Sequence, residues 1–190
     1  MGNAKQNRLT FGNTYVILCI YTKGAMHMST RSMIAVMHGD KAKAVYCHWD
    51  GYVAHNGYIL QTCYDSVKAN KLVAMGDLSS LGADIGEAHD FGRNMSDDMY
   101  VDIGGSVSCS KDCTFYGRDR GEDGTDYEVF HSLQTLLAEA ESRWCEYVYV
   151  FKGNEWFYSK RTVVEQGEEL VNTWTPLAFV SLALNTAEAV

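Results

Sequence analysis

The sequence has very little proline and lacks any long apolar run. Pro176 is the single proline among 190 residues, so proline marks a boundary only near the C-terminus. The apolar run at residues 15–21 is far shorter than the roughly 20 residues that a membrane-spanning helix needs. The sequence shows no secretory signal pattern either. These absences argue against a membrane protein and against a secreted one.

The cysteines also lack the dense, regular spacing of a small disulfide-stabilised scaffold. We therefore expect free thiols and a reducing cytoplasm. The sequence contains no Walker loop, dinucleotide fingerprint or nucleophile elbow, so we expect no cofactor. The six cysteines are Cys19, Cys47, Cys63, Cys109, Cys113 and Cys145.

Positive charge is scarce, and the net charge is −8. Residues 1–27 carry three basic residues and no acidic one, so the rest of the chain holds 13 basic and 24 acidic residues. Residues 84–128 alone contain 12 acidic side chains against four basic ones. Such a surface disfavours direct nucleic-acid binding, which depends on cationic contacts to phosphate. It could attract a basic partner or imitate nucleic acid, although a solubilising role explains it equally.

Residues 1–27 differ in composition from the rest of the chain. Lys23, Gly24 and Ala25 can be encoded by a purine-rich run at a ribosome-binding distance before the codon of Met28. We therefore expect residues 1–27 to be a translated leader or a disordered extension, and residues 28–190 to form a single α+β domain. The alternative is a genuine N-terminal strand at residues 14–21.

Hydrophobic periodicity predicts an α+β fold in which an antiparallel sheet of short hairpin strands packs with two or three helices. The expected strands are residues 32–37, 42–49, 113–116, 146–151 and 156–158. The expected helices are residues 56–75, split near Asp65 and ended by Gly76, residues 130–140, and a short one within residues 177–184. The expected turns and loops are residues 38–41, 77–82, 118–126 and 152–155, with a long irregular loop at residues 82–112.

Residues 46–52, which read YCHWDGY, form the strongest chemical feature of the sequence. Alternation at the end of a strand places Tyr46, His48 and Asp50 on one face and Cys47 and Trp49 on the other. Asp50 beside His48 could orient the imidazole for general acid–base work. The same groups could instead hold the ring or ribose of a ligand. In a purely structural interpretation they form a polar corner, and Trp49 fills the core.

Three arginines are candidates to join this motif. Arg118 and Arg120 follow a predicted strand and could clamp a phosphate or carboxylate, or pair with neighbouring acids in an exposed charge ladder. Arg31 lies on a strand that we expect beside the motif strand. The candidate ligand-binding residues are Arg31, His48, Trp49, Asp50, Tyr52, His55, Asn56, Arg118 and Arg120.

A metal site is weakly indicated. Cys109 and Cys113 have the spacing of a first zinc-ligand pair, but no second closely spaced pair follows them. Cys47, His48 and His55 are the other available ligands. We therefore expect no bound metal.

A series of motifs resembles a family of small, uncharacterised proteins of tailed phages and prophages. The motifs are TRS at residues 30–32, YCHWDGY at 46–52, HNG at 55–57, GDLSSL at 76–81 and GRDRGE at 117–122. The resemblance covers residues 28–122, and members of the family begin at the equivalent of Met28. It implies a phage accessory gene that serves host takeover or counter-defence in the bacterial cytoplasm. It supplies no catalytic residues.

Three functions remain open at this point. The protein could counter a bacterial defence system by binding, either by sequestering a small nucleotide signal or by blocking a host protein. It could be a small enzyme that acts on a nucleotide or a host protein, with His48 as the base and Asp50 orienting it. It could also be a structural or regulatory interaction domain. The sequence leaves the oligomeric state open, a homo-oligomer included, and indicates no membrane partner.

Overall fold

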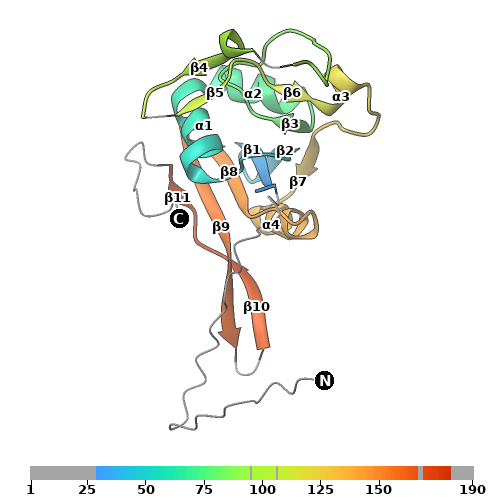
Figure 1. The fold of residues 1–190 in the computed structure, drawn as a ribbon. Coiled ribbons are helices and arrows are strands. Elements are labelled where there is room, and N and C mark those ends of the chain that lie inside the picture. The colour runs from blue at the N-terminus through green and yellow to red at the C-terminus, as the bar shows by residue number, and fades with distance from the viewer. Residues whose placement is uncertain (1–28, 95, 106, 167–168, 181–190) are drawn as a thin grey trace, which may run out of the picture.

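The computed structural model describes residues 29–180 apart from residues 95, 106, 167 and 168. The expected α+β class is confirmed, because the described chain forms a mixed sheet with helices packed on it (Figure 1). The predicted leader at residues 1–27 and the alternative strand at residues 14–21 lie outside the described residues. In the described part no helix is long and apolar enough to cross a membrane.

The main sheet has the strand order β10-β9-β8-β1-β2-β3-β6, with β11 beside β9 and β7 beside β2, and β4 pairs only with β5. The strands are β1 (Ser32–His38), β2 (Lys41–Cys47), β3 (Leu78–Ser80), β4 (Tyr100–Asp102), β5 (Ser108–Ser110), β6 (Thr114–Phe115), β7 (Glu128–Phe130), β8 (Tyr147–Lys152), β9 (Glu155–Gln166), β10 (Glu169–Trp174) and β11 (Ala178–Phe179). The helices are α1 (Tyr58–Cys63), α2 (Ser66–Ala74), α3 (Tyr116–Arg120) and α4 (Leu133–Ser142), with a π-helical turn at Val53–Gly57 and a 3-10 turn at Asp97–Met99.

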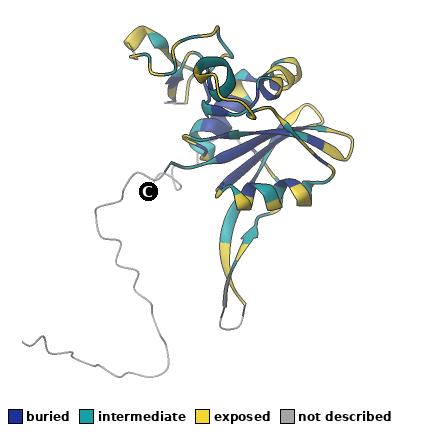
Figure 2. Ribbon diagram, turned by 90° about the vertical axis from the view of Figure 1, so that its right-hand side faces the viewer, coloured by how far each residue is buried: buried dark blue, intermediate teal, exposed yellow. Residues whose placement is uncertain are grey.

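Strand β1 lies in the middle of the sheet and is buried on both faces. It pairs antiparallel with β2 through the predicted hairpin and parallel with β8. Ile34 and Val36 join a core shared with α1, α2, β3 and β6, whereas Met33 and Ala35 join a second core beneath α4. Figure 2 shows the buried strands enclosed between these helical layers. A strand buried on both faces reads as a continuous apolar run, which the sequence shows here.

The predicted helical region splits where expected. Asp65 caps α2 by accepting a hydrogen bond from the backbone N–H of Lys68 at 2.9 Å, and α1 ends two residues before this cap. Gly76, with φ of 86°, follows the end of α2. Tyr64, between the two helices, accepts a hydrogen bond at its carbonyl from the indole of Trp156 at 2.9 Å. Helices α1 and α2 are thereby fixed over one face of the sheet.

Two segments differ from the predicted secondary structure. Residues 77–82 were expected to form a turn, but they include β3, which pairs parallel with β2 and antiparallel with β6. Burial of Leu78 and Leu81 outweighs the turn-like composition of this segment. Phe130 was expected in a helix but pairs with Ala42 as part of β7. The helix α4 begins later because Ser132 forms a capping box with Thr135.

The C-terminal part of the described chain also departs from expectation. Strand β9 is much longer than predicted, and with β10 it forms a ribbon that extends away from the rest of the sheet (Figure 1). A short helix was expected within residues 177–184, but β11 pairs with β9. The backbone N–H of Val180 then donates to the carbonyl of Trp156 at 3.1 Å, which extends the pairing beside β9. Residues 181–190 lie outside the described part.

Residues 82–112, expected to be irregular, contain the β4–β5 hairpin and the 3-10 turn. Two backbone hydrogen bonds, Ala83 N–H to the Ser110 carbonyl at 2.8 Å and Asp84 N–H to the Lys111 carbonyl at 2.7 Å, join the two ends of this segment. The expected charged loop at residues 118–126 begins within α3. We call residues 82–112 the insertion. It lies against the end of the sheet formed by β3 and β6, close to the end of β2.

Candidate functional site

The end of β2 is built around Gly51, which fits where no larger residue could. An added Cβ would lie 2.9 Å from the Thr30 carbonyl oxygen and 2.9 Å from Cβ of Ser32. The N–H of Gly51 donates to the Thr30 carbonyl at 2.8 Å, and its own carbonyl accepts the hydroxyl of buried Tyr149 at 2.8 Å. Asp50, just before it, has φ of 56°, a conformation that is uncommon outside glycine. The backbone therefore turns sharply at this point, and these contacts hold it in place.

Asn56 fixes the inner side of the turn and is fully buried. Its side-chain amide donates to the Trp49 carbonyl at 3.0 Å and to Sγ of Cys47 at 3.4 Å. Its Oδ1 lies 3.0 Å from Nδ1 of His55. Because an amide oxygen can only accept, Nδ1 of His55 carries the proton, and Nε2 is the acceptor of the neutral ring.

His48 is held by Tyr46, with 2.8 Å between the phenol oxygen and Nδ1 of the imidazole. Burial lowers the pKa of His48, and the positive charge of Arg31 lowers it further. Burial also raises the pKa of the Tyr46 phenol, which stays protonated. Arg31 is therefore close enough for its charge to act on His48. Asp50 forms no hydrogen bond or ion pair with His48, so the predicted imidazole–carboxylate pair is absent from the described structure.

Trp49 and Tyr52 project from the turn, with 42% and 40% of their surfaces exposed. The Trp49 ring lies 4.7 Å from the His48 ring, centre to centre, and the Tyr52 ring lies 5.8 Å from that of His55. Strand alternation predicts the burial of Cys47 correctly, but the interpretation of Trp49 as a core residue is wrong. The strand ends at Cys47 and the turn at Asp50 redirects the chain, so alternation does not extend to Trp49.

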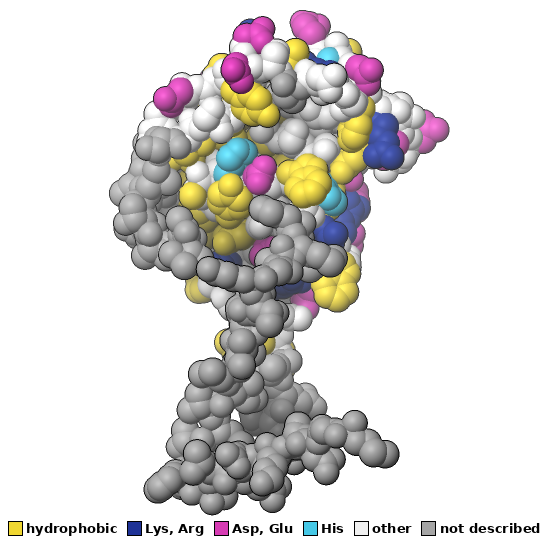
Figure 3. Space-filling view, viewed as in Figure 1, with side chains coloured by type: hydrophobic (Ala, Val, Ile, Leu, Met, Phe, Trp, Pro, Cys, Tyr) yellow, Lys and Arg dark blue, Asp and Glu magenta, His cyan; other side chains and the backbone are white. Residues whose placement is uncertain are grey.

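We call the set of Arg31, Tyr46, His48, Trp49 and Tyr52 the aromatic face. On the side of the molecule in Figure 3, histidine, acidic and large hydrophobic side chains lie next to one another. The aromatic face thus combines the exposed rings of Trp49 and Tyr52 with the His48 imidazole, on which the charge of Arg31 acts.

A cleft of about 280 Å³ adjoins the aromatic face, and we call it the Arg93 cleft. It runs from the turn after β2 to the insertion. Its lining residues are Asp50, His55, Ser80, Leu81, Phe91, Arg93, Tyr100, Ser108, Cys109, Ser110 and Thr114. Of the predicted ligand-binding residues, the structure therefore brings only Asp50 and His55 into this cleft.

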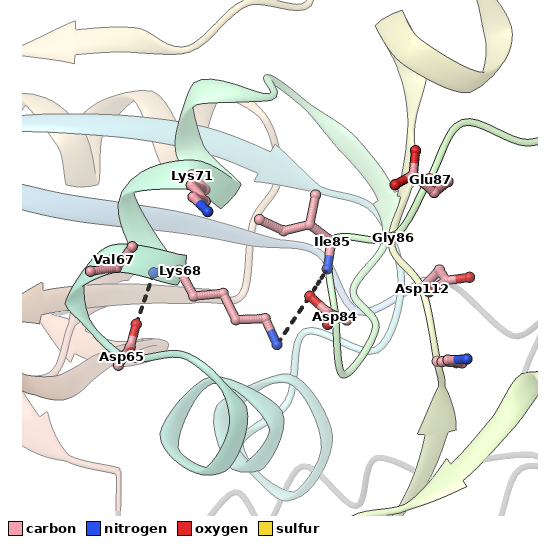
Figure 4. A pocket seen from close by; sticks show the side chains of 10 residues that line it. Asp65, Val67, Lys68, Lys71, Asp84, Ile85, Gly86, Glu87 and Asp112 are labelled. Atoms are coloured by element: carbon pink, nitrogen blue, oxygen red, sulfur yellow. Dashed lines mark hydrogen bonds and ion pairs between the residues drawn. The ribbon is translucent and has the colours of Figure 1, made fainter.

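A larger hollow of about 640 Å³ lies between α2 and the loop segments at residues 84–87 and 111–112 (Figure 4). Lys68 reaches across it, and its ammonium group donates to the Ala83 carbonyl and lies 3.3 Å from Oδ1 of Asp84. The backbone N–H of Ile85 donates to the same carboxylate at 2.7 Å. This lysine's charge is already paired, and the hollow carries side chains of both signs.

Arg118 and Arg120 lie apart from the aromatic face. Arg118 donates to the carbonyls of Ile85, Gly86 and Cys113 at 2.7–2.9 Å and forms a two-point contact with Asp119. Its donors therefore hold the insertion in place. Arg120 is exposed and pairs with Glu122 at 2.9 Å, in the charge ladder weighed above.

The candidate zinc ligands do not converge. Cys113 is fully buried, burial raises the pKa of its thiol to about 11, and its sulfur lies 3.2 Å from the Tyr64 hydroxyl. Within the described ranges no three His, Cys, Asp or Glu side chains are grouped to hold a metal ion.

Comparisons with family models, curated proteins and solved structures returned no match to this chain. Function must therefore be argued from the site itself. Sequence reasoning missed Arg93, Phe91, Tyr100 and the hydroxyl residues of the cleft, because they come from segments that only the fold brings together. The alternating serines of β5, at positions 108 and 110, were the one local signal that could have indicated a polar wall.

Proposed function

We propose that this protein is a phage accessory protein that counters a bacterial defence system by binding, and that the aromatic face docks onto a host protein in the bacterial cytoplasm. The phage assignment rests on the motif resemblance. The binding mode rests on one observation, the exposure of Trp49 and Tyr52 on either side of a rigid turn.

Exposed aromatic rings beside an arginine have the composition of a protein-binding hot spot. Tryptophan, tyrosine and arginine are enriched at interfaces, since large rings remove much apolar surface from water at little entropic cost. Here Gly51 and Asn56 hold the backbone of the turn before any partner arrives. A preorganised face loses less conformational entropy on binding, which favours affinity.

The charge of the chain favours a basic partner. The insertion carries several exposed carboxylates without an ion pair in the described structure, including Glu87, Asp97 and Asp102. These charges would speed encounter with a basic protein surface and would oppose association with nucleic acid. Docking through the aromatic face, steered by the acidic insertion, is consistent with both features.

Nucleotide sequestration by the predicted residue set has less support. His48, Trp49 and Tyr52 line neither of the two hollows described above, and the rings of Trp49 and Tyr52 are exposed. Arg118, one of the proposed phosphate ligands, is fully engaged with backbone carbonyls and Asp119. Exposed rings that lie outside both hollows fit a macromolecule better than a small ligand.

One observation favours a second candidate, a small enzyme. His48 has a lowered pKa and a fixed ring, so it is neutral at physiological pH and held in one orientation. A general base requires such a neutral, oriented imidazole. In that case the orienting group is Tyr46 and not Asp50. Turnover of a host protein or nucleotide that survives His48→Ala unchanged would eliminate this candidate.

The docking proposal is tested by co-purification from bacteria that carry defence systems. The tagged protein is expressed as wild type, as the Trp49→Ala/Tyr52→Ala double variant, and as Trp144→Ala. Trp144 is a matched control because it is 69% exposed and lies at the end of α4. We expect a host protein that the wild type and the control retain and the double variant loses. Equal retention by the double variant would contradict docking through the aromatic face.

A further inference from the structure

The Arg93 cleft has a polar lining that the aromatic face does not use. Its wall is formed by β5 and by the paired residues Ser80 and Thr114 of β3 and β6, and Phe91 and Tyr100 contribute aromatic rings. In the described chain the hydroxyl groups of Ser80, Ser108 and Thr114 form no hydrogen bond. Ser108 is exposed, Ser80 and Thr114 are partly exposed, and none of the three hydroxyl oxygens is a buried atom without a partner.

The side chain of Arg93 is only 19% exposed, yet its guanidinium has few polar partners in the described structure. Its buried Nε has no hydrogen-bond partner, and Nη1 lies 3.8 Å from Oδ2 of Asp112, beyond hydrogen-bonding distance. Asp112 itself does not line the cleft. A desolvated cation with an unmet hydrogen-bond donor is a strong site for a phosphate or carboxylate, which can replace this weak ion pair.

The cleft also contains hydrogen-bond acceptors. Because Asn56 fixes the proton of His55 on Nδ1, the Nε2 atom of the neutral ring is an acceptor, and the Asp50 carboxylate lies nearby. These acceptors suit hydroxyl or amino groups of a ligand and would repel a second anionic group. The cleft therefore combines a cation, Arg93, that can bind an anion with acceptors, at Asp50 and His55, that can bind hydrogen-bond donors.

We propose that the Arg93 cleft binds a nucleoside 5′-monophosphate. The phosphate pairs with Arg93, the ribose hydroxyls contact the serine and threonine hydroxyls, and the base lies against the exposed Tyr100 ring with its donors toward Asp50, because the Phe91 ring is already engaged by Tyr116 and Arg120. A volume of about 280 Å³ lies just below the range typical of small-molecule sites, so a mononucleotide fits the cleft better than a cyclic dinucleotide does. This site is separate from the aromatic face and does not depend on the docking proposal.

Calorimetry with the full chain tests the proposal. The probes are AMP, GMP, CMP and UMP, together with adenosine and inorganic phosphate. We expect at least one monophosphate to bind, and adenosine and inorganic phosphate each to bind at least tenfold more weakly. No heat with any of the monophosphates at millimolar concentration would overturn the proposal. Inorganic phosphate binding as tightly as the nucleotides would show an anion site only and would also overturn it.

Variants then locate the site. Arg93→Gln should weaken monophosphate binding at least tenfold, whereas Lys152→Gln, which removes an exposed cation at the end of β8, should leave it unchanged. Tyr100 is 47% exposed, so Tyr100→Ala provides a second lining variant that keeps the fold if Arg93→Gln does not. It should weaken binding severalfold. If Arg93→Gln folds and binds the monophosphate as tightly as the wild type, the nucleotide does not bind in the Arg93 cleft. If Arg93→Gln does not fold, unchanged affinity in Tyr100→Ala would lead to the same conclusion. Loss of docking in Trp49→Ala with intact nucleotide binding would separate the two proposals.

Discussion

The phenol oxygen of Tyr46 lies 2.8 Å from Nδ1 of His48. Tyr46 therefore orients the imidazole, a role that the sequence had suggested for the Asp50 carboxylate. The two residues are two apart on the same face of the strand end, so strand geometry brings them together. Asp50, another two residues on, leaves this face because its left-handed backbone turns the chain. The polar groups of the motif therefore divide between the aromatic face and the Arg93 cleft.

The first prediction concerns the titration of His48. Its pKa in the folded protein should lie below 6.5, because burial and then Arg31 both disfavour the imidazolium. Since the unfolded chain binds this proton at higher pH than the folded one, the contribution of His48 to stability should be lost as pH falls from about 6.5 through the folded pKa. NMR titration of the His48 ring measures the midpoint.

Substitution of Arg31 separates the two causes. In Arg31→Gln the pKa of His48 should rise but stay below 6.5, since burial is the larger cause. The control Lys152→Gln should leave the midpoint unchanged. A midpoint at or above 6.5 in the wild type would show that the imidazole is better hydrated than the structure has it.

The second prediction concerns Asn56. Asn56→Ala removes the donor to the buried Trp49 carbonyl and leaves Nδ1 of His55 without its partner. Unsatisfied buried polar groups typically cost about 1–3 kcal/mol, so the free energy of unfolding should fall by roughly that amount. Urea unfolding measures the change, with exposed Asn94→Ala as the control that stays near wild type. A loss no greater than that of the control would show that the turn does not depend on this amide.

The third prediction concerns Gly51. In Gly51→Ala the added methyl group would press on the backbone at Thr30 and on Ser32, at 2.9 Å from each. Overpacking of this kind costs about 1–3 kcal/mol and should displace the aromatic face. Gly92→Ala serves as control, because the nearest atom to an added Cβ there is 3.8 Å away. Thermal unfolding of both variants provides the comparison, and equal melting temperatures would contradict the tight fit at Gly51.

The fourth prediction concerns Trp49. Because its ring is 42% exposed, Trp49→Ala should change the free energy of unfolding by less than about 1 kcal/mol. Truncation of a core aromatic costs about 3–5 kcal/mol, and buried Trp156→Ala should show a loss of that size. Denaturant unfolding of both variants distinguishes the cases. A loss of about 3–5 kcal/mol in Trp49→Ala would instead indicate that Trp49 is a core residue, as the purely structural interpretation holds.

Local signals in the sequence were sufficient for much of the fold. The β1–β2 turn follows from Gly39, whose φ is 65°, and the break between α1 and α2 follows from the Asp65 cap. Strand β3 could not be predicted, because its Asp-Ser-Gly setting resembles a turn and only pairing with β2 and β6, which are distant in sequence, makes it a strand. Strand β10 was missed for the same reason, since its partner β9 defines it.

The candidate site was predictable only where its residues are neighbours in sequence. The motif at residues 46–52 identified His48, Trp49 and Tyr52 together, but exposure of the rings depends on a turn that alternation cannot foresee. The Arg93 cleft joins the turn after β2 to the insertion, so it exists only once the sheet has formed. Arg118 looked free in the sequence because the carbonyls that it contacts are backbone groups from distant segments.

The most direct test of the docking account is whether the aromatic face is required for counter-defence in cells. A panel of bacterial strains, each carrying one defence system, is challenged with a sensitive phage while expressing the protein. We expect the wild type and Trp144→Ala to restore plaque formation in at least one strain, and the folded Trp49→Ala/Tyr52→Ala variant to fail there. Full restoration by the double variant, or no restoration by the wild type in any strain, would contradict the account.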